Sequence, residues 1–314
     1  MSRLRSEVLE WLADGRAAPG CERQVLLRAG LIPTSGDWRL FLSRLALWLG
    51  TLALAAAVIF FLAYNWDSLG RFAKFGLVEA AMLAALVACW RSDLNEPAGK
   101  AVLVLLSLLT GALLALTGQV YQTGADTFEL FAWWAALILP WVLVGRFSPL
   151  WLLWLALLNL AVLLYDQVGG RGDAVLWSLL GLNTAALAAW EAANRAGLSW
   201  LRDSWPPRLV ALAATAAATS LAIEAVFDGS PGFTPAIAYA LWLGAFCYWY
   251  RRIRCDLFML AAALLSLVLC AAAWLTQTIP NNGAGGALLI GLVVIIMSGG
   301  GAMWLRHIGR EQEA

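Results

Sequence analysis

The stretch LALWLGTLALAAAVIFFLAY, residues 45–64, has no charged side chain in 20 residues. An α-helix rises about 1.5 Å per residue, so this length crosses the roughly 30 Å hydrocarbon core of a bilayer. A helix also satisfies its own backbone hydrogen bonds, as lipid requires. We therefore expect residues 45–64 to form a transmembrane helix.

Nine further apolar runs follow along the chain. Together with the first they predict an all-α, polytopic transmembrane helical bundle of about ten spans. The fifth, sixth and eighth runs are short for a span, and re-entrant segments are the alternative for these three. The expected spans are residues 45–64, 72–90, 101–117, 128–145, 150–165, 175–190, 209–227, 235–250, 257–276 and 287–305.

The overall composition agrees with a protein whose main solvent is lipid. Hydrophobic residues make up 62% of the 314 residues, charged residues make up 13%, and the mean hydropathy is +0.76. Because nucleic-acid binding needs a concentrated basic face, the net charge of +1 argues against such a partner. We expect no secretory signal peptide, since the first forty or so residues are charged.

The basic residues predict how the spans are oriented. With ten spans and the N-terminus inside, 18 of the 21 Lys and Arg residues lie on the cytoplasmic side, and only Arg71, Lys74 and Arg171 lie outside. Tryptophan side chains prefer the headgroup region, and here they lie at the ends of the expected spans, in agreement with this orientation. The inner ends carry Trp90, Trp151, Trp190, Trp249 and Trp304, and the outer ends carry Trp66 and Trp274. We expect both termini in the cytoplasm.

Residues 1–42 precede the first span as a separate unit. Their apolar residues recur at helical spacing in two stretches, separated by a break at Asp14-Gly15. This predicts a short cytoplasmic helical hairpin, which either docks a partner or lies as an amphipathic cap on the membrane surface. Residues 43–306 then form the ten-helix transmembrane domain, and residues 307–314 form a short cytoplasmic tail.

Few residues suited to catalysis are present. His307 is the only histidine and lies at the cytoplasmic end of the last span, which excludes Ser/His and Cys/His catalytic arrangements and histidine-ligated zinc or haem inside the membrane. The five cysteines show no CxxC spacing, and no glycine-rich nucleotide-binding motif occurs. We therefore expect no catalytic residue, no metal and no cofactor, and the sequence leans against an enzyme.

Polar residues near the hydrocarbon are the best pointers to function, because burying them there is costly. The densest group is GQVYQTGAD, residues 118–126, which leads through Glu129 into the fourth span. Its glycines allow close backbone approach or a positive φ. The candidate ligand-binding residues are Gln119, Tyr121, Gln122, Asp126 and Glu129, with Asn65 and Asp67 at the same predicted depth.

Two interpretations of these residues apply. In one, they line an outward-facing cavity in which the amides and Tyr121 orient a polar or cationic ligand and a carboxylate balances its charge. In the other, they are solvated loop residues and helix caps. Further polar groups at this depth are Tyr165-Asp166, Glu224 with Asp228, and Gln277 with Asn281-Asn282.

Some polar residues lie deeper in the expected spans. Glu79, in the second span, and Glu224, in the seventh, are candidates for a proton relay, and for Glu79 a structural hydrogen bond is the alternative. Asn159 and Asn183 lie in the fifth and sixth spans. For these two amides we expect hydrogen bonds between helices.

The N-terminal hairpin, the run FLAYNW at residues 61–66 and the run GQVYQ at residues 118–122 resemble a known bacterial family. It is the predicted-membrane-protein family catalogued as domain of unknown function 2157, and the resemblance covers roughly the N-terminal half. The resemblance implies the inner membrane of a bacterium and supplies no catalytic residues. It also implies other membrane subunits as partners.

The sequence is compatible with three functions. The leading hypothesis is binding or translocation of a small polar or amphipathic solute, with the bilayer and a small-molecule or lipid ligand as partners. The alternative is a non-catalytic subunit, scaffold or sensor of a cell-envelope complex that docks through the N-terminal hairpin. A third is an enzyme acting on a lipid-linked substrate, with an outer-loop carboxylate such as Asp67 as base or metal ligand, although the loop around Asp67 is short for a substrate platform.

Overall fold

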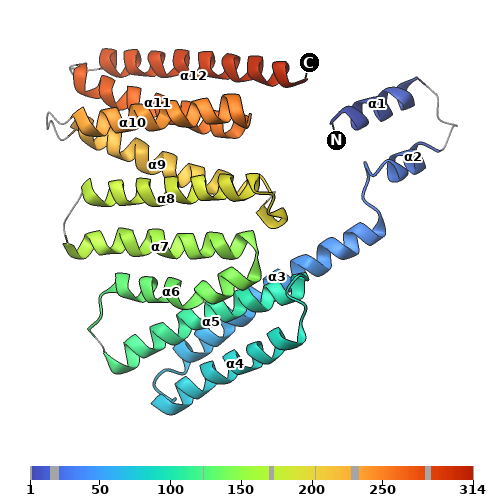
Figure 1. Ribbon diagram of the computed structural model, residues 1–314, viewed down its shortest axis with the longest axis vertical. Helices are drawn as coiled ribbons and strands as arrows, with labels where there is room; N and C mark the ends of the chain where they lie inside the picture. The colour runs from blue at the N-terminus through green and yellow to red at the C-terminus, as the bar shows by residue number, and fades with distance from the viewer. Residues whose placement is uncertain are drawn as a thin grey trace. The chain divides into compact units, whose positions relative to one another are not determined.

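The computed structural model describes residues 2–14, 21–122, 124–169, 173–201, 203–227, 233–279 and 284–313. This part of the chain is entirely helical and contains no β-strand, which confirms the all-α class (Figure 1). The helices are α1 (Ser2–Ala13), α2 (Glu22–Arg28), α3 (Ser35–Tyr64), α4 (Arg71–Arg91), α5 (Pro97–Tyr121), α6 (Thr127–Gly145), α7 (Ser148–Gly169), α8 (Asp173–Arg195), α9 (Trp205–Phe227), α10 (Phe233–Tyr248), α11 (Leu257–Thr278) and α12 (Ala284–Glu313). A 3₁₀ turn, η1 (Ser199–Leu201), precedes α9, and a π-helical turn, η2 (Trp249–Ile253), extends α10.

Eight of the described helices are long and apolar enough to cross a membrane. They are α3, α4, α5, α6, α7, α9, α11 and α12, a set of apolar helices expected of a multi-pass membrane protein. The two other expected spans correspond to α8 and α10. Helix α10 is only 16 residues long, whereas α8 is long enough but contains polar residues such as Asn183 and Thr184, which lower its hydropathy.

The first expected span lies inside a longer helix, α3. This helix begins at Ser35 because Thr34 and Asp37 form a capping box at its start. The backbone N–H of Thr34 donates to the Asp37 carboxylate (2.8 Å), and the backbone N–H of Asp37 donates to Thr34 Oγ1 (3.2 Å). Residues 35–44 are therefore helical and continue directly into the apolar segment.

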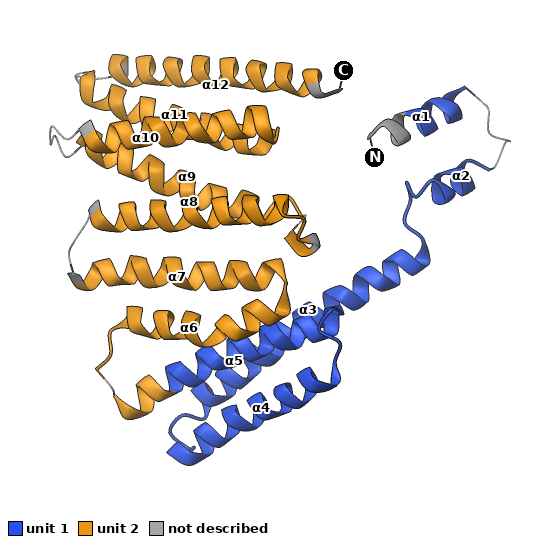
Figure 2. Cartoon of the chain, viewed as in Figure 1, with its two compact units in different colours: residues 1–116 blue, residues 117–314 orange. Residues whose placement is uncertain are grey.

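The chain divides into two compact units, residues 1–116 and residues 117–314, and each is described by itself (Figure 2). In the first unit, Ala85 of α4 packs with Leu106 and Leu109 of α5. The turn between these helices lies against Gly99, where an added Cβ would collide with the backbone of Asp93. A glycine is therefore required at this position.

In the second unit, helices α7 to α11 alternate in direction (Figure 1). Ser148, at the start of α7, donates from its hydroxyl to the carbonyl of Trp200, which follows α8 (3.1 Å). Arg208, near the start of α9, pairs with Asp256, directly before α11. The starts of α7, α9 and α11 therefore share one end of the unit with the end of α8, and we call it the basic end because Arg195, Arg208 and Arg254 lie there.

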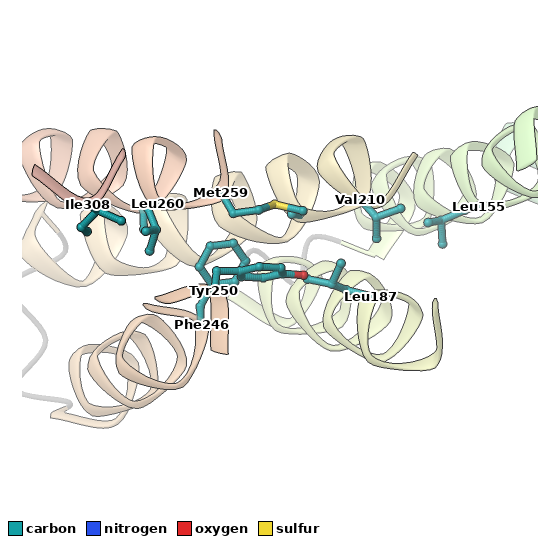
Figure 3. Packing of buried hydrophobic residues seen from close by; sticks show 10 residues of the cluster. Leu155, Leu187, Val210, Phe246, Tyr250, Met259, Leu260 and Ile308 are labelled. Atoms are coloured by element: carbon teal, nitrogen blue, oxygen red, sulfur yellow. The ribbon is translucent and has the colours of Figure 1, made fainter. Parts of the chain in front are cut away.

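The core of the second unit is built around α9, in which small residues allow close helix approach. Helix α9 packs against α8, α10 and α11, and α11 also packs against α12. Figure 3 shows one group of buried side chains, with Tyr250 and Phe246 lying among apolar residues from neighbouring helices. The group consists of Leu155, Leu187, Val210, Ala211, Phe246, Tyr250, Met259, Leu260, Ala263 and Ile308.

Candidate functional site

The polar stretch singled out in the sequence forms the turn between α5 and α6. Helix α5 ends at Tyr121, Gln122 adopts φ +46°, and Gly124 adopts φ +65°, the positive φ that the glycine allows. Asp126 is the N-cap of α6, and Glu129 lies half-buried in the first turn of that helix. The side chains of Gln119, Tyr121, Gln122 and Asp126 are exposed, and Thr123 lies outside the described residues.

The other candidate residues are spread over both units. Asn65 caps the end of α3 by donating from its amide to the Phe61 carbonyl (2.9 Å), and Asp67 is exposed in the following turn. Glu79 on α4 is exposed, as is Glu224 on α9. The proton relay through these two carboxylates stays a prediction. Asp228, Asn281 and Asn282 lie outside the described residues.

A cavity of about 430 Å³ lies between α6, α7 and α8, at the opposite end from the basic end. Phe128, two residues after Asp126, contacts Tyr165 edge-on with 5.0 Å between ring centroids. Tyr165, Asp166 and Ser178 are the polar side chains of the lining, and the remaining lining is aliphatic apart from Phe128. The cavity thus has an apolar wall and a carboxylate, which suits an amphipathic ligand. Of the sequence candidates, Tyr165 and Asp166 line it.

The two asparagines expected to bond between helices do so. Asn159 of α7 and Asn183 of α8 exchange amide hydrogen bonds, with Nδ2 to Oδ1 distances of 3.2 and 2.5 Å. Each amide also donates to the backbone carbonyl four residues earlier in its own helix. This prediction is confirmed, and the pair fastens α7 to α8 near the middle of both helices.

A buried hydroxyl cluster, which the sequence did not reveal, joins α9, α10 and α11. The Ser266 hydroxyl lies 2.6 Å from Thr219 Oγ1 and 2.8 Å from the Tyr239 hydroxyl. All three side chains are buried, and their hydroxyls partner one another, while Thr219 Oγ1 also bonds the Thr215 carbonyl. Small hydroxyl residues scattered in apolar runs give no sequence signal of their convergence.

Two ion pairs at the basic end were also missed. The buried Glu191 carboxylate accepts hydrogen bonds from Arg254 Nη1 (2.8 Å) and from the Tyr250 hydroxyl (3.1 Å). Asp256 accepts from Arg208 through both of its oxygens, each at 3.1 Å. The sequence does carry a sign of these ion pairs. Acidic residues occur among the arginines on the side that is expected to be cytoplasmic.

The described residues include no group of three or more His, Cys, Asp or Glu side chains arranged to hold a metal ion. Glu191, the most buried carboxylate of this region, is instead neutralised by Arg254. In the described part of the second unit, some polar groups make paired contacts between helices, and others line the cavity between α6, α7 and α8.

Residues 9–151 match the family model described as "Predicted membrane protein (DUF2157)". This part of the chain, less than half of its length, is similar to that family. The match runs from α1 to the first turn of α7 and confirms the resemblance expected for the N-terminal half. No curated protein matches the chain, and no solved structure does. Most of the cavity lining, from Leu158 onward, lies beyond the residues of the DUF2157 match.

Proposed function

We propose that the chain crosses the membrane ten times. Helix α8 packs against α7 and α9, which run in one direction, so the chain must return across the same layer through α8. The same argument applies to α10 between α9 and α11, because η2 extends this helical segment to Ile253. The polar residues of α8 do not oppose this, since Asn183 and Thr184 pair with neighbouring helices.

The proposed orientation places the basic end in the cytoplasm, with both termini on that side. The gathering of Arg195, Arg208 and Arg254 at one end of the second unit supports it through the positive-inside rule. A bacterial inner membrane is the proposed location. The cavity between α6, α7 and α8 then opens toward the outer face of the membrane.

The proposed function is to bind a small amphipathic solute in this outer cavity and to carry it into the bilayer or across it. The observation that carries the proposal is the aliphatic cavity with Asp166, Tyr165 and Phe128 in its wall. A carboxylate beside aromatic rings favours a ligand with a cationic group. The exposed turn before α6, with Gln122 and Asp126, would form the approach to it.

Binding of tetraphenylphosphonium, a small apolar cation, to the purified full-length protein in mild detergent tests this proposal. Equilibrium dialysis should show saturable binding that Asp166→Asn weakens by about tenfold, equivalent to about 1.4 kcal/mol. Asp203→Asn, an exposed carboxylate near the basic end, is the matched control and should bind as the wild type does. Equal binding by the Asp166 and Asp203 variants would reject the outer cavity as the site.

The scaffold alternative has one observation in its favour. Leu9 and Trp11 of α1 are 49% and 57% exposed, as expected for a docking surface. Deleting residues 1–33 before the capping box separates the two functions. Under the leading proposal the deletion leaves binding of tetraphenylphosphonium unchanged, whereas under the alternative it releases partner subunits that co-purify with the full chain.

A further inference from the structure

A second cavity, of about 310 Å³, lies at the basic end between the start of α7, the end of α8 and η1. Four tryptophans, Trp151, Trp154, Trp190 and Trp200, contribute to its wall, and we call it the tryptophan pocket. The rest of the lining consists of leucine and alanine, without a charged side chain. It is thus an apolar pocket at the level where helices leave the hydrocarbon, the depth at which indole rings gather.

Contacts among the rings hold the pocket in shape. Trp151 stacks on Trp200 with 6.0 Å between centroids and meets Trp154 edge-on at 5.7 Å. The Ser148 hydroxyl fixes η1 by donating to the Trp200 carbonyl, and Trp154 Nε1 donates to the Ala135 carbonyl (3.1 Å). The wall is therefore largely preformed, which lowers the entropic cost of binding a ligand.

Two indole N–H groups of this wall have no acceptor. Nε1 of Trp151 and Nε1 of Trp190 are enclosed by protein, and no described residue accepts a hydrogen bond from either. Trp190 is only 8% exposed, so an unpaired donor there is costly. Both rings line the pocket. A ligand oxygen would satisfy both donors.

The nearby backbone supplies an independent sign of function. Arg146, five residues before Trp151, ends α6 in the left-handed conformation (φ +41°, ψ +48°), which favours glycine. Its side chain is exposed. An arginine in this conformation is strained, as residues at functional sites can be, and it places an exposed positive charge just before the start of α7.

We propose that the tryptophan pocket binds one anionic glycerophospholipid. An ester carbonyl of the lipid accepts from Trp151 and Trp190, an acyl chain fills the leucine and alanine part of the pocket, and the phosphate lies beside Arg146. The neutral lining matches an ester better than a charged group, and both ester and phosphate lie at this depth in a bilayer. The site is at the opposite end of α7 and α8 from the outer cavity, so it is independent of the proposed solute.

Native mass spectrometry of the delipidated full-length protein, with dioleoylphosphatidylglycerol or dioleoylphosphatidylethanolamine added, tests the proposal. The wild type should retain one phosphatidylglycerol more strongly than one phosphatidylethanolamine. Because each lost hydrogen bond weakens binding by about fivefold, Trp151→Phe/Trp190→Phe should lower the affinity for phosphatidylglycerol by at least about tenfold. The exposed pair Trp133→Phe/Trp274→Phe is the control and should bind as the wild type does.

The single variants distinguish a lipid site from a structural role. Without lipid, Trp190→Phe should unfold at the wild-type temperature or above it, because phenylalanine leaves no unpaired donor, yet it should gain less stability from added phosphatidylglycerol. Arg146→Gly should relieve the left-handed strain and abolish the preference for phosphatidylglycerol, whereas Arg306→Ala should keep it. Wild-type lipid retention by the double Phe variant, or lipid loss only in variants with lowered unfolding temperatures, would overturn the proposal.

Discussion

Glu191 and Arg254 form an ion pair, and removing the arginine should destabilise the second unit more than removing the glutamate charge. The Glu191 side chain is 5% exposed, whereas that of Arg254 is 31% exposed. Arg254→Gln leaves a buried carboxylate with only the Tyr250 hydroxyl as a strong donor, and we expect a loss of about 3 kcal/mol. Glu191→Gln keeps an acceptor oxygen for Tyr250 and leaves an arginine that can turn toward water, so we expect a loss of about 1 kcal/mol.

Reversible unfolding of the purified protein in mixed micelles, by titration with sodium dodecyl sulfate, gives the two free-energy differences. Arg252→Gln is the matched control, because Arg252 is exposed two residues before Arg254, and its effect should stay within about 0.5 kcal/mol. A loss from Glu191→Gln equal to or greater than that from Arg254→Gln would refute the reasoning. Such a result would mean that leaving the half-buried arginine unpaired costs at least as much stability as leaving the buried carboxylate unpaired.

Two further predictions concern helix packing. Gly99→Ala should lower the free energy of unfolding by about 2 kcal/mol, because the added Cβ meets rigid backbone. Gly118→Ala is the control and should be neutral or stabilising, because the space around Gly118 is open. Similar unfolding midpoints for the two variants would contradict this reasoning. Asn183→Leu should lower the free energy of unfolding by about 1 kcal/mol, because the Asn159 amide loses its partner. In a double-mutant cycle, Asn159→Leu/Asn183→Leu should lower it by no more than the single variant does. Additive losses would mean that the two amides act separately.

Much of the helical fold could be predicted from the sequence, because hydrocarbon tolerates few departures from long apolar helices. Helix α3 contains the complete segment 45–64, and the turn between α5 and α6 lies at the predicted polar stretch. Helices α8 and α10 have a weaker transmembrane signal in the sequence. Their apolar runs are short or interrupted, and only their packing against neighbours supports a crossing.

Less of the site could be predicted, since a site depends on which side chains meet across helices. The Asn159–Asn183 contact was expected because an amide within hydrocarbon needs a partner. Glu191 escaped notice because it lies among charged residues at a helix end, where a solvated position is the ordinary expectation. Its burial follows from Tyr250 and Arg254, which approach from about 60 residues farther along the chain.

Helix α8 illustrates how polarity and packing are linked in this chain. Its Asn183, Thr184 and Glu191 pair respectively with α7, with Trp242 of α10 and with Arg254 before α11, so each polar group selects one neighbour. Apolar contacts alone select neighbours weakly in lipid, where tails and side chains are equally hydrophobic. The outer cavity and the tryptophan pocket both have α8 in their walls. The residues that make α8 a poor transmembrane segment by composition are therefore those that position the walls of both proposed binding sites.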